Sequence, residues 1–155
     1  MIERLAVRWD TGRPRDRYRG RLREGRAGPG GPRVALLEPQ TYMNEAGRSV
    51  GPARGAYRLP LERVLVVHDE IDLPFGEVRS RVGGGLAGHN GLKSLRAELG
   101  GGDFARVRVG VGRPPSSAPD VVADYVLSRF REPSSEVDQL VDRACDAVAA
   151  VVSAH

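Results

Sequence analysis

Residues 66–91 constrain this chain more than any other stretch, and they read VVHDEIDLPFGEVRSRVGGGLAGHNG. A run of aliphatic residues ends in the His-Asp-Glu triplet at residues 68–70, and a glycine-rich loop then leads to His89 and Asn90. In open α/β sheets, polar groups at the ends of strands and the starts of helices form binding and catalytic sites. We therefore expect the functional site in this stretch.

The length and composition fit one domain. A chain of 155 residues can bury about two-thirds of the surface that it exposes when unfolded. Its one cysteine, Cys145, cannot form an intramolecular disulfide, and no apolar segment has the length of a signal peptide or a membrane span. We expect a single soluble domain over residues 1–155 in a reducing compartment, the cytoplasm.

The positive charge is concentrated near the start of the chain. The net charge is +4, and residues 1–33 hold ten arginines against four acidic residues. A basic end of this kind attracts polyanions such as RNA. However, the chain has 23 arginines and one lysine, and a base-composition bias in the genome explains that ratio equally well. Charge alone leaves both explanations open.

The hydropathy pattern predicts strands and helices that alternate around one mixed central β-sheet, an α/β fold. Four segments have the spacing of helices: residues 2–9, from about 41–44 to 57, 91–99, and from 134–135 to 152. Four segments have the pattern of strands: residues 34–37, 63–67, 77–82 and 107–111. Residues 11–32 read as an irregular arm or a weak hairpin around 18–23, and residues 121–127 as a short strand or a turn.

Polar residues that can cap these helices stand at their starts: Thr41 or Asn44, Asn90, and Ser134 or Ser135. Pro52 lies inside the second predicted helix and is expected to divide it.

Asn44, Asp69, His89 and Asn90 all fall at predicted element boundaries, so the fold can bring them together. A histidine beside an aspartate supports general base catalysis, because the carboxylate fixes the tautomer and stabilises the imidazolium. Nearby asparagines can orient a water or donate to a developing oxyanion. Two structural roles stay open as alternatives: Asp69 can end a strand by capping a turn, and His89 can face solvent beside a helix cap.

Several other kinds of site are not expected. The glycine loop has no GKS or GKT sequence and matches no nucleotide-phosphate fingerprint. A metal site is not expected, because beyond His68 and His89 the sequence offers only the terminal His155 and the isolated Cys145. No serine occupies a GxSxG elbow.

Three segments carry a family resemblance: EPQTYMNEAGRSV (38–50), VVHDEIDLPFGEVRSRVGGGLAGHNGLKSL (66–95) and FARVRVGVGRP (104–114). In this order they resemble the bacterial peptidyl-tRNA hydrolase family. The resemblance implies a single α/β domain that hydrolyses the ester between a peptide and the 3′ end of tRNA, and so recycles prematurely released peptidyl-tRNA. It also implies a monomer that uses no cofactor.

The resemblance assigns roles to residues at the site. Asp69 would orient the catalytic base, and His89 and Asn90 would position substrate and water near the tRNA terminus. Met43 and Asn44 would line the groove that binds the peptide.

Arg81 and Arg108 look like the cationic pair that grips the 5′ phosphate of the tRNA. The chemistry agrees, because a guanidinium binds phosphate through a bidentate fork and the two arginines are predicted on separate strands beside the glycine loop. Leu86 and Ala87 occupy loop positions that vary or are usually glycine in the family, which is a mild departure.

A larger departure concerns the start of the family pattern. The family begins with a strand, a GLGNPG turn and a TRHN segment, which supply an asparagine and the general-base histidine. These segments do not precede Ile2 in this sequence. We therefore expect this chain to lack the first, central strand and to show negligible hydrolysis.

Two explanations are open for this departure: a gene model that begins at an internal start codon, or a divergent, non-catalytic homologue that binds tRNA. A separate alternative for the chain as a whole is an unrelated α/β domain with a shared loop. An in-frame upstream GLGNPG and TRHN coding stretch would favour the first explanation. An upstream stop codon would exclude it.

Overall fold

The structure is a computed structural model that describes residues 1–85, 89–113 and 132–154. The helices in these ranges are α1 (Ile2–Trp9), η1 (Met43–Glu45), α2 (Gly47–Tyr57), η2 (Leu61–Arg63), α3 (Asn90–Leu99) and α5 (Ser134–Ser153), where η marks a 3-10 helix. The strands are β1 (Arg15–Arg17), β2 (Gly20–Arg26), β3 (Arg33–Pro39), β4 (Leu65–Glu70), β5 (Val78–Val82) and β6 (Ala105–Gly110). The predicted segment 121–127 lies outside the described residues, as do Leu86 and Ala87.

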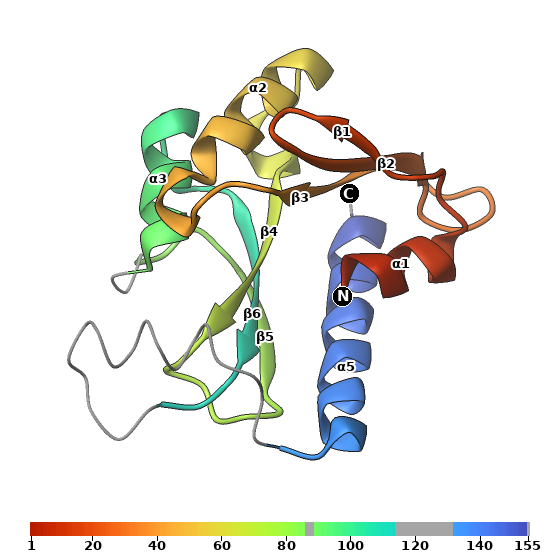
Figure 1. Cartoon of the computed structure of the whole chain (residues 1–155), viewed down its shortest axis with the longest axis vertical. Coiled ribbons are helices and arrows are strands. Elements are labelled where there is room, and N and C mark those ends of the chain that lie inside the picture. Colours follow the sequence, from red (N-terminus) through yellow and green to blue (C-terminus); the bar gives the residue numbers. More distant parts are fainter. Residues whose placement is uncertain (86–88, 114–131, 155) are drawn as a thin grey trace.

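An antiparallel sheet is formed by β1, β2 and β3 (Figure 1). The turn between β1 and β2 consists of Tyr18 and Arg19, with φ of 53° and 52°. Positive φ at both central residues gives the turn a twist that matches a two-residue hairpin. Of the two interpretations of residues 11–32, the structure therefore supports the hairpin.

A second sheet has the order β4-β6-β5, in which β4 and β6 run parallel and β5 pairs antiparallel with β6. The α/β class and the mixed sheet are confirmed. The prediction of one sheet is wrong for the described residues, because β3 and β4 do not pair with each other. Both strands instead line a cavity of about 1670 Å³.

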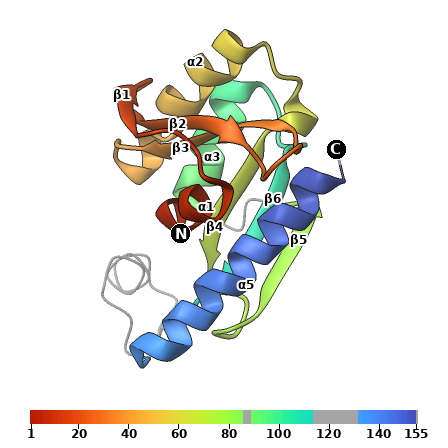
Figure 2. The ribbon, with the colours of Figure 1, turned by 90° about the vertical axis from the view of Figure 1, so that its right-hand side faces the viewer.

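Helices pack on both faces of the mixed sheet. On one face, α5 crosses β5 and β6 (Figure 2), and with α1 it closes a core of Leu5, Trp9, Leu36, Val107, Cys145 and Val148. On the other face, α3 contributes to a core of Val64, Leu92, Leu95, Leu99 and Phe104. The spacing of the three leucines is that of one helical face, so their burial explains why α3 forms and where it packs.

The predicted caps and the predicted break in α2 are wrong. The N-cap positions of α2 and α5 are Ala46 and Pro133, and neither makes a side-chain cap hydrogen bond. The helix α2 continues through Pro52. Packing supports it: the amide of Gly47 donates to Ser94 Oγ at 2.9 Å, and a side chain on Gly47 would collide with α3.

Many arginines near the start of the chain have acidic partners within the protein. Arg4 forms ion pairs with two aspartates of α5 at 3.1 and 2.9 Å, and Arg8 pairs with Asp146 at 2.8 Å. Arg15 pairs with Glu24, and Arg23 pairs with Glu38 at 3.0 Å. Part of the basic surplus therefore ties α1 and β2 to their neighbours. The exposed pairs, which exclude the one made by the buried Arg23, contribute only about 0–1 kcal/mol each.

No helix in the described ranges is both long enough and apolar enough to cross a membrane.

Candidate active site

Asp69 and His89 meet where the end of β4 lies beside the start of α3. Nε2 of His89 is 3.2 Å from Oδ1 of Asp69. His89, not Asn90, is the N-cap residue of α3, and its Nδ1 accepts the backbone N–H of Leu92 at 3.2 Å. Since Nδ1 accepts, Nε2 of the neutral ring carries the hydrogen and donates to the carboxylate. The helix cap thus fixes the tautomer that faces Asp69.

The Asp69 carboxylate is held in its ionised form. Burial disfavours the charge, but the hydrogen bond and the electrostatic attraction from the His89 side chain outweigh it, so the pKa of Asp69 lies below its ordinary value. The expected alternative of a solvent-facing His89 is wrong, because the His89 side chain is 17% exposed and bonded to Asp69.

His68 lies against the edge of the His89 ring. The two ring centroids are 5.0 Å apart, with the planes at 70°. Nδ1 of His68 lies 2.9 Å from the carbonyl oxygen of Asp69, and because a carbonyl only accepts, Nδ1 carries the hydrogen. Burial lowers the pKa of His68, and the bond to this carbonyl opposes the shift only in part. Its Nε2 is buried and has no hydrogen-bond partner within the part of the chain that the structure describes.

Met43 and Asn44 reach the same region from η1, which packs against α3. A side chain on Gly91 would contact both Met43 Sδ and the His89 ring, so the thioether lies beside the histidine. Both residues are exposed, Met43 to 46%. The cavity that separates the two sheets extends to this region, and its lining includes all the predicted catalytic and substrate-binding residues: Met43, Asn44, Asp69, His89 and Asn90. The structure therefore brings these residues to one cavity.

Arg81 and Arg108 lie on adjacent strands of the mixed sheet, β5 and β6. The register pairs Arg81 with Arg106 and Arg79 with Arg108, so the two predicted phosphate ligands are diagonal neighbours. They differ in environment. Arg108 is largely buried and pairs with Glu70 at 3.1 Å. Arg81 is exposed, and its guanidinium lies against the backbone of Gly84.

Arg106 was not predicted, although it is the largest fully buried side chain in the described residues, at 1% exposure. Its guanidinium donates to the carbonyl oxygens of Gly85 at 2.8 Å, Gly84 at 3.3 Å and Gly102 at 2.9 Å. It thereby holds the glycine loop against β6. One signal was present in the sequence: Arg106 and Arg108 are two residues apart, so a strand places both on one face.

In the described ranges, no group of three or more His, Cys, Asp or Glu residues is placed to hold a metal ion.

Comparison with known proteins identifies close relatives along the whole sequence. A family model described as "Peptidyl-tRNA hydrolase" matches residues 1–155. The peptidyl-tRNA hydrolase of Gloeobacter violaceus is 44% identical over 154 residues, which are 98% of this chain and 76% of that protein. The peptidyl-tRNA hydrolase of Sorangium cellulosum is 56% identical over 105 residues, 68% of this chain and 47% of that protein.

Solved structures have the same fold. A crystal structure of a peptidyl-tRNA hydrolase in complex with N-propanol matches with a TM-score of 0.84 and 35% identity, over 97% of this chain and 76% of the solved chain. The crystal structure of peptidyl-tRNA hydrolase from Acinetobacter baumannii gives a TM-score of 0.81 at 35% identity, over 96% of this chain and 72% of that one.

Proposed function

The chain belongs to the peptidyl-tRNA hydrolase family, and from this premise we propose that it hydrolyses the ester between a peptide and the 3′ end of tRNA. The observation that carries the proposal is the Asp69–His89 contact of 3.2 Å. It lies in the lining of the cavity that Asn44 and Asn90 also line. Ester hydrolysis needs an oriented water and donors for the oxyanion, and this set of side chains can supply both.

Asp69 acts as the anion that orients the proton acceptor or the attacking water. Its Oδ1 accepts from His89, and the ionised carboxylate has further acceptor sites on Oδ2. Both ring nitrogens of His89 are engaged, one by Leu92 N–H and one by Asp69. His89 is therefore a positioning residue for Asp69, and the amide groups of Asn44 and Asn90 donate to water or to the oxyanion.

The substrate spans the two parts of the site. Met43 and Asn44 contact the peptide, because an exposed thioether and an amide suit an extended chain of varied side chains. Arg81 and Arg108 attract the tRNA phosphate at the other part. We propose that the protein works in the cytoplasm, where peptidyl-tRNA is produced, as a monomer and without a metal cofactor.

The test is release of the N-acetylated amino acid from N-acetyl-aminoacyl-tRNA. The family resemblance assigns proton transfer to a histidine of a TRHN segment, so the chain is assayed as printed and with that family segment added at its front. Hydrolysis by either protein that depends on Asp69 supports the proposal. Tight binding of tRNA with an intact ester in both proteins contradicts it and supports a non-catalytic RNA-binding homologue.

A further inference from the structure

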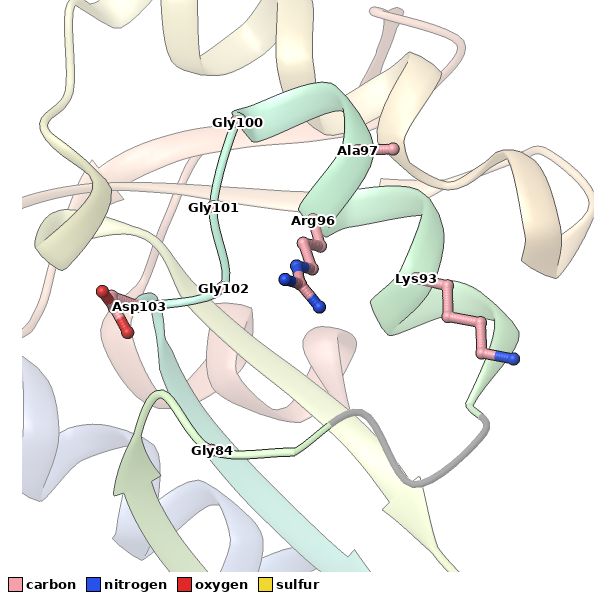
Figure 3. A pocket seen from close by; sticks show the side chains of 8 residues that line it. All are labelled: Gly84, Lys93, Arg96, Ala97, Gly100, Gly101, Gly102 and Asp103. Atoms are coloured by element: carbon pink, nitrogen blue, oxygen red, sulfur yellow. The ribbon is translucent and has the colours of Figure 1, made fainter.

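A second hollow lies outside the Asp69–His89 site, between α3 and the turn that leads into β6 (Figure 3). Its volume is about 690 Å³. Eight residues line it: Gly84, Lys93, Arg96, Ala97, Gly100, Gly101, Gly102 and Asp103. Half of this lining is glycine, so a ligand here can approach the backbone closely.

Two cations of α3 line this pocket. Lys93 and Arg96 are one helical turn apart, on the same side of the helix, and both are exposed. In Figure 3, Arg96 points into the space between α3 and the glycine turn, and Lys93 extends from the same helix farther from Asp103. Within residues 1–85, 89–113 and 132–154 neither cation has an acidic partner. Their charge is available to an anion.

More positive charge lies directly behind the pocket. Arg106 bonds to the carbonyl oxygens of Gly84 and Gly102, two residues of the lining, so these carbonyls direct their partial negative charge to Arg106. On the other side of Gly84 lies the Arg81 guanidinium, close enough to exclude a side chain at that glycine. The pocket is therefore continuous with the predicted phosphate-binding arginine.

The chemistry of the lining favours the sugar-phosphate backbone as the ligand. Among the lining residues there is no aromatic side chain on which a base could stack. Cations and glycine backbone bind phosphate oxygens without reading the sequence. Asp103 is the one acidic residue of the lining, and its negative charge repels such a ligand. Removing that charge should therefore strengthen binding.

We propose that the pocket of Lys93 and Arg96 binds backbone phosphates of the tRNA next to the phosphate held at Arg81. This inference rests on the proposed function, because it assigns part of the tRNA to a new surface. The surface that binds phosphate would then extend from Arg81 on β5, past Gly84, to α3. The pocket thus positions the tRNA without taking part in ester cleavage.

The experiment measures binding of deacylated tRNA to the full chain as a function of salt. The double variant Lys93→Ala/Arg96→Ala is expected to weaken binding about tenfold and to reduce the salt slope by about one to two. The matched control Arg13→Ala/Arg33→Ala removes the same charge from two exposed positions, one before β1 and one at the start of β3, and should leave both values nearly unchanged. Asp103→Asn should strengthen binding by a few fold, because it removes a negative charge from the pocket.

The outcomes separate the two proposals. If tRNA binds and the Lys93/Arg96 variant matches the parent, or if the control loses as much affinity, the pocket assignment is wrong while the hydrolase proposal stands. A chain that binds no tRNA overturns both. In the hydrolysis assay the same variant should raise KM and keep kcat, whereas a lower kcat at unchanged KM would contradict a role in positioning alone.

Discussion

Nε2 of His89 lies 3.2 Å from Oδ1 of Asp69, and this contact joins the start of α3 to the end of β4. The same imidazole accepts the amide of Leu92. One side chain therefore both caps a helix and orients a carboxylate. Since the ring is bound at both nitrogens, its position depends on the helix as much as on its acidic partner.

Replacing Asp69 by Asn should lower turnover by about 10²-fold and leave tRNA affinity nearly unchanged. The amide can still accept from His89, so the geometry is kept while the negative charge is lost. The measurements are kcat for N-acetyl-aminoacyl-tRNA in a protein that shows hydrolysis, and the Kd for deacylated tRNA. Asp146→Asn, an exposed aspartate of α5, is the control. Equal turnover in the Asp69 and Asp146 variants would contradict the role of Asp69.

Two substitutions at His89 should separate its structural role from its role at the site. His89→Ala removes both the cap and the contact with Asp69, so it should lower the free energy of unfolding by about 1 kcal/mol and also lower turnover. His89→Asn keeps an acceptor for the α3 amides and should retain stability, yet lose turnover. Urea unfolding and hydrolysis assays provide the two readouts. If stability and turnover fell together in both variants, the cap would explain the whole effect.

The sequence predicted well those features that depend on local pattern. The leucine spacing of α3 and the alternation of Val107 and Val109 identified a helix and a strand that the structure confirms. The predicted catalytic and substrate-binding residues were also found at one cavity, because each stands at or near the boundary of a regular element: η1, the end of β4 or the start of α3.

Features that depend on distant contacts were not predictable. His89 and Asn90 are both polar, and only the fold shows which one bonds to the α3 amides. Burial of Arg106 runs against the usual exposure of arginine. It depends on the β5–β6 register and on carbonyls supplied by the glycine loop and by Gly102. No local pattern carries this information.

The stability of the fold should decrease as the pH falls from 7.5 to 5.5, through His68. Burial lowers the pKa of His68 in the folded chain, so the unfolded chain binds the proton more readily, and acidification below about 6.5 favours unfolding. The ionisable groups that face this ring are Asp69, Glu70 and His89. The depressed pKa of Asp69 changes the free energy of unfolding only at lower pH, near the ordinary pKa of an aspartate and below. Urea unfolding across this pH range measures the effect.

His68→Asn is the matched variant for this pH dependence. It keeps a donor for the Asp69 carbonyl but cannot titrate, so its free energy of unfolding should change less between pH 7.5 and 5.5 than that of the parent. The same unfolding measurements are repeated with and without His68→Asn in a protein that also carries His89→Asn, so that the other histidine at the site cannot titrate. If the parent and the His68 variant showed the same pH dependence, another group would carry it.

Replacing Arg81 and replacing Arg108 should change the free energy of unfolding by different amounts, although the sequence suggests one shared role for the two arginines. Arg108 neutralises Glu70, which is 8% exposed, so Arg108→Ala leaves a buried carboxylate unpaired and should lower the free energy of unfolding by about 3 kcal/mol. Arg81 is exposed and has no acidic partner within the described part of the chain, so Arg81→Ala should leave stability within about 0.5 kcal/mol of the parent. Arg81→Ala should still weaken tRNA binding and flatten its salt dependence.

The double variant Glu70→Gln/Arg108→Gln removes both charges of the buried pair and should recover much of the stability that Arg108→Ala loses. If Arg81→Ala left the salt slope unaltered, Arg81 would be excluded from the phosphate site.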